Sequence, residues 1–193
     1  MVCAEQQCTN HANPSLRSGA DVKGQANVRR TLARSKGKKM KKQLLSFNEQ
    51  LLLEQNAVEE LIKIFSNNID TSVIIYSDWN AKDVLGHITY WHLGFARNLS
   101  DAAFQKTQNP FKGSLTEVNE RGVKEMENYS IEELITKIRE AQIQININIG
   151  NKNVDLIEYK KGSRPYSVIE HLEVTRRHIT WHIKDLKKKY EIM

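Results

Sequence analysis

Apolar residues recur at intervals of three and four positions in five stretches of the chain, with polar residues between them. This spacing is typical of helices that bury one face. The five stretches lie near residues 40–68, 80–99, 114–126, 130–149 and 167–189. Four of them are long and one is short, so the pattern predicts an all-α fold, a four-helix bundle with a short extra helix.

Four of these stretches open with a capping box, in which a Ser or Asn is followed three residues later by Glu or Asp. The pairs are Asn80–Asp83, Ser114–Glu117, Ser130–Glu133 and Ser167–Glu170. Gly150 follows the fourth stretch and is predicted to be its C-cap. Residues 151–165 form a long connection, and long loops in small domains often cover the functional end of a scaffold.

Charge divides the chain into two parts. Residues 1–42 hold ten Lys and Arg against two acidic residues, a net of +8, whereas the remainder holds 19 against 21, a net of −2. Residues 1–39 are predicted to be a disordered basic tail, and residues 40–193 the folded bundle. Because the composition changes sharply at Met40, we expect Met40 to be the natural start and the tail not to be native.

Few other features of the sequence change this picture. Cys3, Cys8 and His11 lack a fourth metal ligand and are interpreted as part of the loose tail. There is no apolar run of the length that a membrane span needs and no apolar core of a signal peptide. Two cysteines near one end do not make a disulfide framework. We therefore expect a cytoplasmic protein with no membrane partner.

Histidines form a stripe on the last predicted helix. His171, Thr175, His178 and His182 follow one another at helical spacing, which places them along one side, at the border of the apolar face. A His-x-x-x-His pair such as His178 and His182 brings two imidazoles within reach of one metal ion. The candidate third ligand is His87, near the start of the helix at 80–99.

Three neutral imidazoles with an open fourth position suit a divalent metal, with Zn²⁺ expected and nickel or iron as alternatives. Asp83, one turn before His87, is a candidate outer-shell acceptor. His171 is too far along the helix from His178 to bind the same ion, and it is a candidate catalytic acid or base. A structural role is the competing interpretation for His171 and for His92.

The residues from Trp79 to Trp91 resemble the W-x-x-K-D-x-L-x-H segment of the DinB-like superfamily, most closely its ClbS/DfsB branch. Residues 178–186 resemble the closing helix of that branch, and the likeness covers roughly residues 43–190. The resemblance implies a DinB-like four-helix bundle that binds metal through one His of the second helix and two of the last. By position, these are His87, His178 and His182. His92 stands where an acidic residue is common in the branch.

The resemblance also implies a function. The superfamily contains metal-dependent thiol transferases and hydrolases that disarm electrophiles, and the ClbS type protects its host by opening a reactive cyclopropane. We therefore expect an enzyme that adds water or a thiol to a small-molecule electrophile, in detoxification or self-protection. Its expected partners are a low-molecular-weight thiol and, as a homodimer, a second copy of the chain.

Two other functions remain open. A non-catalytic bundle that binds and sequesters a small molecule is consistent with the lack of a nucleophile motif in the folded part. A nucleic-acid-associated module would act through the phosphate-binding potential of the basic tail. Nucleic acid is the less favoured partner, because the basic charge lies in the tail and not in the folded part.

Overall fold

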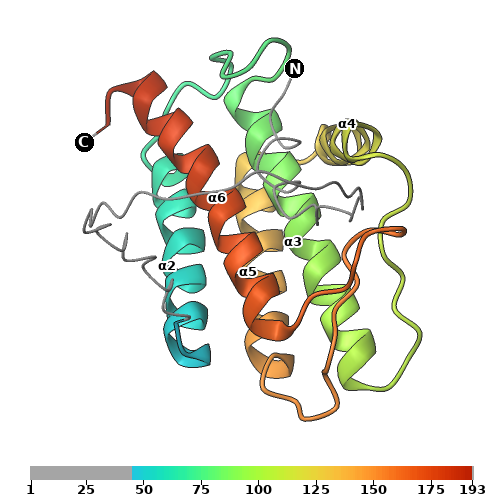
Figure 1. Ribbon diagram of the computed structural model, residues 1–193. Helices are drawn as coiled ribbons and strands as arrows, with labels where there is room; N and C mark the ends of the chain where they lie inside the picture. The colour runs from blue at the N-terminus through green and yellow to red at the C-terminus, as the bar shows by residue number, and fades with distance from the viewer. Residues whose placement is uncertain (1–44, 193) are drawn as a thin grey trace, which may run out of the picture. The chain divides into compact units, whose positions relative to one another are not determined.

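Residues 45–192 are the part of the chain that the computed structural model describes, and they form five α-helices (Figure 1). The helices are α2 (Phe47–Ser66), α3 (Ala81–Ala103), α4 (Leu115–Met126), α5 (Ile131–Asn148) and α6 (Val168–Tyr190). This part contains isolated β-bridges but no strand. The predicted all-α fold of four long helices and one short one is confirmed. The predictions for the tail at 1–39, for Met40 and for Cys3, Cys8 and His11 lie outside the described residues.

The four long helices form the bundle, and α4 lies across it (Figure 1). Helices α2 and α6 pack side by side, and so do α3 and α5, while α4 packs against α3. The chain runs one way along α2 and α6 and the opposite way along α3 and α5 (Figure 1). This arrangement places the facing sides of α3 and α6 inside the bundle.

Every described helix begins with a capping box, in which the side chain of the first residue and a carboxylate three positions later satisfy each other's backbone N–H groups. The four predicted boxes are confirmed, and Ser46 with Glu49 forms a fifth. The predicted C-cap at Gly150 is wrong. Helix α5 ends on Ile149, which keeps a right-handed helical conformation, and Gly150 does not have positive φ. The Ile149 N–H still binds the Ile145 carbonyl, so no left-handed residue is needed.

The buried apolar side chains form two clusters along the bundle. One cluster joins α2, the first half of α3, α4, the start of α5 and the end of α6. The other joins the second half of α3, the end of α5, the start of α6 and the connection before it. Along α3, the first cluster ends at Tyr90 and the second begins at Phe95. The buried residues between these two positions on α3 are His92, which is polar, and Gly94.

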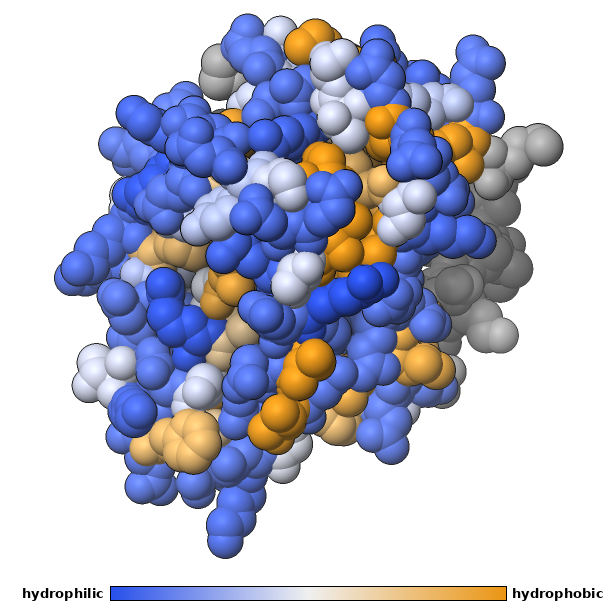
Figure 2. All heavy atoms as spheres, turned by 180° about the vertical axis from the view of Figure 1, so that it is seen from behind, coloured by the Kyte–Doolittle hydropathy of each residue, from blue (hydrophilic) through white to orange (hydrophobic). Residues whose placement is uncertain are grey.

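The surface opposite the face of Figure 1 is largely hydrophilic, with apolar groups scattered over it (Figure 2). The exposed apolar side chains include Ile143 and Ile147 on α5. Within residues 45–192, no helix is long and apolar enough to cross a membrane.

Gly94 on α3 allows the close approach of the Phe111 ring, which stacks on Tyr90 and meets Trp91 edge-on. A Cβ at position 94 would overlap this ring, and its neighbours leave it no room to move. We therefore expect Gly94→Ala to lower the free energy of unfolding by about 1–3 kcal/mol, measured by urea denaturation. Gly150→Ala is the control, because a Cβ there meets nothing within 4 Å. Equal stabilities of the two variants would contradict this packing.

Candidate metal centre

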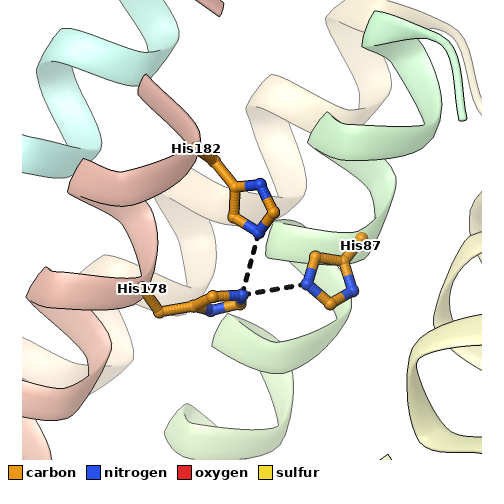
Figure 3. Close-up of side chains that lie close together, drawn as sticks. All are labelled: His87, His178 and His182. Atoms are coloured by element: carbon orange, nitrogen blue, oxygen red, sulfur yellow. Dashed lines mark hydrogen bonds between the residues drawn. The ribbon is translucent and has the colours of Figure 1, made fainter. Parts of the chain in front are cut away.

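Helices α3 and α6 bring three imidazole rings together inside the bundle. His87 comes from α3, and His178 and His182 come from consecutive turns of α6 (Figure 3). The Nε2 atom of His178 lies 2.9 Å from Nε2 of His87 and 3.1 Å from Nε2 of His182. One ring nitrogen from each histidine lies within 4.8 Å of the other two, an arrangement that could hold a metal ion. We call these residues the histidine triad.

Hydrogen bonds alone do not satisfy the histidine triad. An imidazole nitrogen carries either one proton or one lone pair in the ring plane, so Nε2 of a neutral His178 can make one N–H···N bond. It faces two nitrogens, and therefore one of the two short contacts has no proton along it. A cation among the three atoms would attract all three lone pairs. Tetrahedral Zn²⁺ with Zn–N distances of about 2.0–2.1 Å separates its nitrogen ligands by roughly 3.3 Å. The two distances from His178 are close to this value, and the three nitrogens together lie within 4.8 Å of one another.

A hydrogen-bond chain fixes the orientation of His182. The Tyr76 hydroxyl donates to Oδ2 of Asp185 over 2.8 Å and lies 2.9 Å from Nδ1 of His182. Because the single hydroxyl proton points to the carboxylate, the contact with His182 needs a proton on Nδ1. The Nε2 atom of His182 is then unprotonated and free to bind a metal. Such partners orient ligands in metalloproteins and raise their basicity.

Local backbone structure places Tyr76 against α6. The N–H groups of Ile75 and Tyr76 both bind the Trp79 carbonyl, and the Ala81 N–H at the start of α3 binds the Val73 carbonyl. The Tyr76 ring also stacks on Trp181 at 5.6 Å between centroids. The connection between α2 and α3 therefore carries the side chain that orients one member of the histidine triad.

The predicted role of Asp83 as an outer-shell acceptor for His87 is wrong. Its carboxylate accepts the backbone N–H of Asn80 and completes the capping box of α3. Nδ1 of His87 is buried and has no hydrogen-bond partner among the described residues. Tyr76 and Asp185 take the outer-shell role instead, at His182.

Burial keeps the histidine triad uncharged. It lowers the pKa of His178 to about 4, since little water remains to solvate an imidazolium. Burial also lowers the pKa of His87 and of His182 well below the ordinary value, and the neighbouring His178 adds to the effect. Neutral imidazole is the form that binds metals.

All three tryptophans of the chain lie beside the histidine triad. The Trp79 ring centroid is 4.9 Å from that of His87, Trp181 is 4.8 Å from His182, and Trp91 is 6.5 Å from His178. Trp91 also donates its Nε1–H to Asn119 of α4. These rings surround the polar centre with aromatic surface, which limits the access of water.

The structure places His171 and His92 near the histidine triad but not in it. His171 is buried and stacks on Phe95 at 4.1 Å between centroids, with Tyr159 of the long connection 6.3 Å away. Burial, with a contribution from His92, lowers the pKa of His171 to about 3. The imidazole of His171 is thus neutral at neutral pH, and its catalytic role stays a prediction. His92 is buried and donates to Gln142, as the structural interpretation expects.

Glu54 of α2 is a buried carboxylate that the sequence reasoning did not single out. Its side chain is fully buried, 3.8 Å from Nε2 of His92, and Oε2 accepts a hydrogen bond from Gln142. Burial raises the pKa of Glu54 from 4.5 to about 7, and the bond from Gln142 offsets only part of this rise. In the sequence, Glu54 stands among Leu51, Ala57 and Val58 on the apolar side of its helix. A charged residue on the core-facing side of a helix is the sequence feature that could have identified Glu54.

These observations define a class of protein, a four-helix bundle with a candidate centre for a divalent metal. Two solved structures resemble it, both of a mycothiol-dependent maleylpyruvate isomerase, and one of them carries a histidine-to-alanine mutation. The TM-scores are 0.61 and 0.60, each with 13% sequence identity, and each match covers 74% of this chain. Because the identity is low, the likeness shows the fold alone. The chain spans 61% of the isomerase chains.

Two further comparisons give no match: no protein-family model and no curated protein resembles the chain. The four-helix-bundle fold expected from the sequence is thus confirmed by structure. Membership of the DinB-like superfamily and of its ClbS/DfsB branch stays a prediction.

The raised pKa of Glu54 gives a pH dependence that can be measured. The folded state favours the protonated carboxyl, so this contribution to stability is complete below pH 4.5 and is lost as pH rises through about 7. Glu54→Gln cannot ionise. We therefore expect the variant to gain roughly 2–4 kcal/mol over the wild type between pH 4.5 and 8, measured by urea denaturation.

Exposed Glu59 of the same helix provides the control, and Glu59→Gln should show no comparable change with pH. His92, which faces Glu54 from α3, has a pKa lowered to about 4 and stays neutral over most of this range. A wild type and a Glu54→Gln variant that respond equally to pH would show that Glu54 is not buried as described.

Proposed function

We propose that the protein is a metal-dependent enzyme that adds a thiol or water to a small electrophile, with the metal bound by His87, His178 and His182. The observation that carries the proposal is the convergence of three Nε2 atoms, from buried His87 and His182 and from part-buried His178, that hydrogen bonds do not satisfy. The protonated Nδ1 of His182 supports it, because this proton leaves Nε2 available for the ion. The Zn²⁺ ion fits the donor set, and nickel and iron also accept imidazole ligands.

A bound divalent ion supplies Lewis acidity, which activates a thiol or water nucleophile at neutral pH. The chain's own residues prepare the centre. Tyr76 and Asp185 orient His182, and the tryptophan rings restrict water around the triad. His171 accepts a proton only weakly because of its low pKa, and its proposed role is to assist proton transfer near the substrate.

A thiol nucleophile would have to come from a second molecule. The sequence has only Cys3 and Cys8, so residues 45–192 contain no cysteine. The two structurally similar chains belong to an enzyme described as mycothiol-dependent, which supports a low-molecular-weight thiol as the cosubstrate. With the resemblance to the ClbS/DfsB branch, this favours a role in detoxification or self-protection.

A second candidate function is binding without turnover. The aromatic rings around the triad and the lack of a cysteine in the bundle would suit a protein that sequesters its ligand. The two candidates differ in whether product accumulates beyond one equivalent.

Metal content tests the proposed centre. We expect protein purified without a histidine tag to contain one divalent ion per chain by elemental analysis. His178→Ala should lose nearly all of it, because His178 is the central ligand. His92→Gln is the control, since it changes a buried histidine outside the triad and should retain the ion. Equal metal content in the two variants would defeat the assignment.

The same preparations test turnover. Metal-loaded wild type should consume a small thiol in the presence of an epoxide or an activated cyclopropane, and His178→Ala should not. A metal-loaded protein that binds the electrophile but stops at one equivalent would support sequestration instead.

Tyr76→Phe tests the hydrogen-bond chain at the centre. The loss of its hydroxyl leaves Nδ1 of His182 without its acceptor, and removal of such a partner typically weakens metal binding about 10–100-fold. The affinity can be measured by competition with a chromophoric chelator. Tyr129→Phe, at a tyrosine that packs beside Lys137, should leave the affinity unchanged. Tight binding in Tyr76→Phe would mean that the hydroxyl does not orient the ligand.

A further inference from the structure

A buried layer of polar side chains crosses the bundle beside the histidine triad, and the proposed reaction does not use most of it. All four long helices contribute to the layer. Its members, which we call the polar layer, are Gln50, Glu54, His92, Gln142 and His171. Each is at most 8% exposed. Along α3, His92 falls between the two apolar clusters, so the layer interrupts the core.

Hydrogen bonds fix the orientation of the central amide. The Nε2 group of Gln142 donates to Oε2 of Glu54 over 2.9 Å and to Oδ1 of Asn146 over 3.1 Å. Because Nε2 of Gln142 faces two acceptors, its Oε1 must face His92, 2.8 Å away. The Nε2 atom of His92 therefore carries the proton, and Nδ1 of this neutral ring is a hydrogen-bond acceptor.

The polar layer has unused hydrogen-bonding capacity. Nδ1 of His92, Oε1 of Glu54 and Oε1 of Gln50 are buried, and none has a partner within residues 45–192. Nδ1 of His92 is an acceptor because the ring proton is on Nε2, and Oε1 of Glu54 is an acceptor when the carboxyl is ionised. Buried polar atoms are normally paired, so several unpaired atoms in one layer indicate a missing partner. The partner they require is a hydrogen-bond donor.

The charge of the polar layer also indicates that the missing partner is a hydrogen-bond donor. Glu54 is its one acidic member, and burial keeps His92 and His171 neutral at neutral pH. The ion pairs in the described part of the chain give Glu54 no lysine or arginine partner. A cation that carries N–H groups would stabilise the ionised carboxylate and satisfy its free oxygen. A carboxylate or phosphate would instead meet the negative charge of Glu54 and the acceptor Nδ1 of His92.

We propose that the polar layer is a binding site for the ammonium group of a small molecule, with Glu54 as its anionic partner and His92 as a further acceptor. This site is beyond the proposed function, because binding there does not require the metal ion. His178 contributes electrostatically to His92, so the two sites are neighbours. An amine-bearing substrate could then be held by its ammonium group next to the histidine triad.

The proposal can be tested with simple ammonium ions. The full chain is stripped of metal, and methylammonium and propylammonium chloride are titrated at pH 7.5 and constant ionic strength, with NMR shifts and calorimetry as the readouts. We expect saturable binding in the wild type. Glu54→Gln should weaken it at least about tenfold, because a charged hydrogen bond is replaced by a neutral one. Exposed Glu59→Gln should bind as the wild type does, and sodium propionate should not bind.

Three results would overturn the proposal: equal binding by Glu54→Gln and the wild type, equal effects of propionate and propylammonium, or a crystal structure at saturating propylammonium with only ordered water in the layer. Glu54→Gln keeps the shape of the side chain and removes a buried charge, so loss of folding would not explain its result. The metal analysis of His178→Ala is independent of this experiment. Failure of the ammonium-binding experiment would therefore not contradict the proposed metal centre, and the reverse also holds.

Discussion

Crowding of three imidazole nitrogens around His178 is the constraint on which the interior of this protein depends. Each ring is uncharged at neutral pH, and together the rings have too few protons for the contacts that they make. Left alone, such a centre would cost stability, because buried polar atoms without partners are unfavourable by about 1–3 kcal/mol each. A cation turns the same three lone pairs into ligands. The packing around the centre therefore leaves three ring nitrogens in an arrangement that could hold an ion.

The scaffold holds this centre from both sides. The capping box at Asn80 fixes the start of α3, and the backbone bonds from the preceding connection to Trp79 and Ala81 hold that connection against the helix. The same connection carries Tyr76 to α6. Near the same C-terminal end of α6, Lys187 pairs with Glu60 of α2. The positions of His87 and His182 thus follow from contacts made one to two turns away from them.

Much of the fold and of the candidate site could be predicted from local sequence. Capping boxes and the His-x-x-x-His pair depend on residues three or four positions apart, and a helix fixes such neighbours in space. The third candidate ligand, His87, was predicted from its place near the start of a capped helix and from the recognisable segment around it. The contact of Tyr76 with His182 and Asp185 joins residues more than a hundred positions apart, and nothing in the local pattern points to it. The role assigned to Asp83 failed for a related reason, since its capping bond competed with the proposed one.

Glu54 shows how the two polar features of the bundle are related. A core made only for stability would place an apolar residue there, because the carboxylate loses its hydration and gains only one good hydrogen bond, from Gln142. The same bundle already bears the cost of burying the histidine triad. On α2, Glu54 lies between the residues that pack on the two apolar clusters, whereas the histidine triad lies among residues of the first cluster on α3 and α6. The apolar side chains around both polar groups therefore supply the stability that these groups lack.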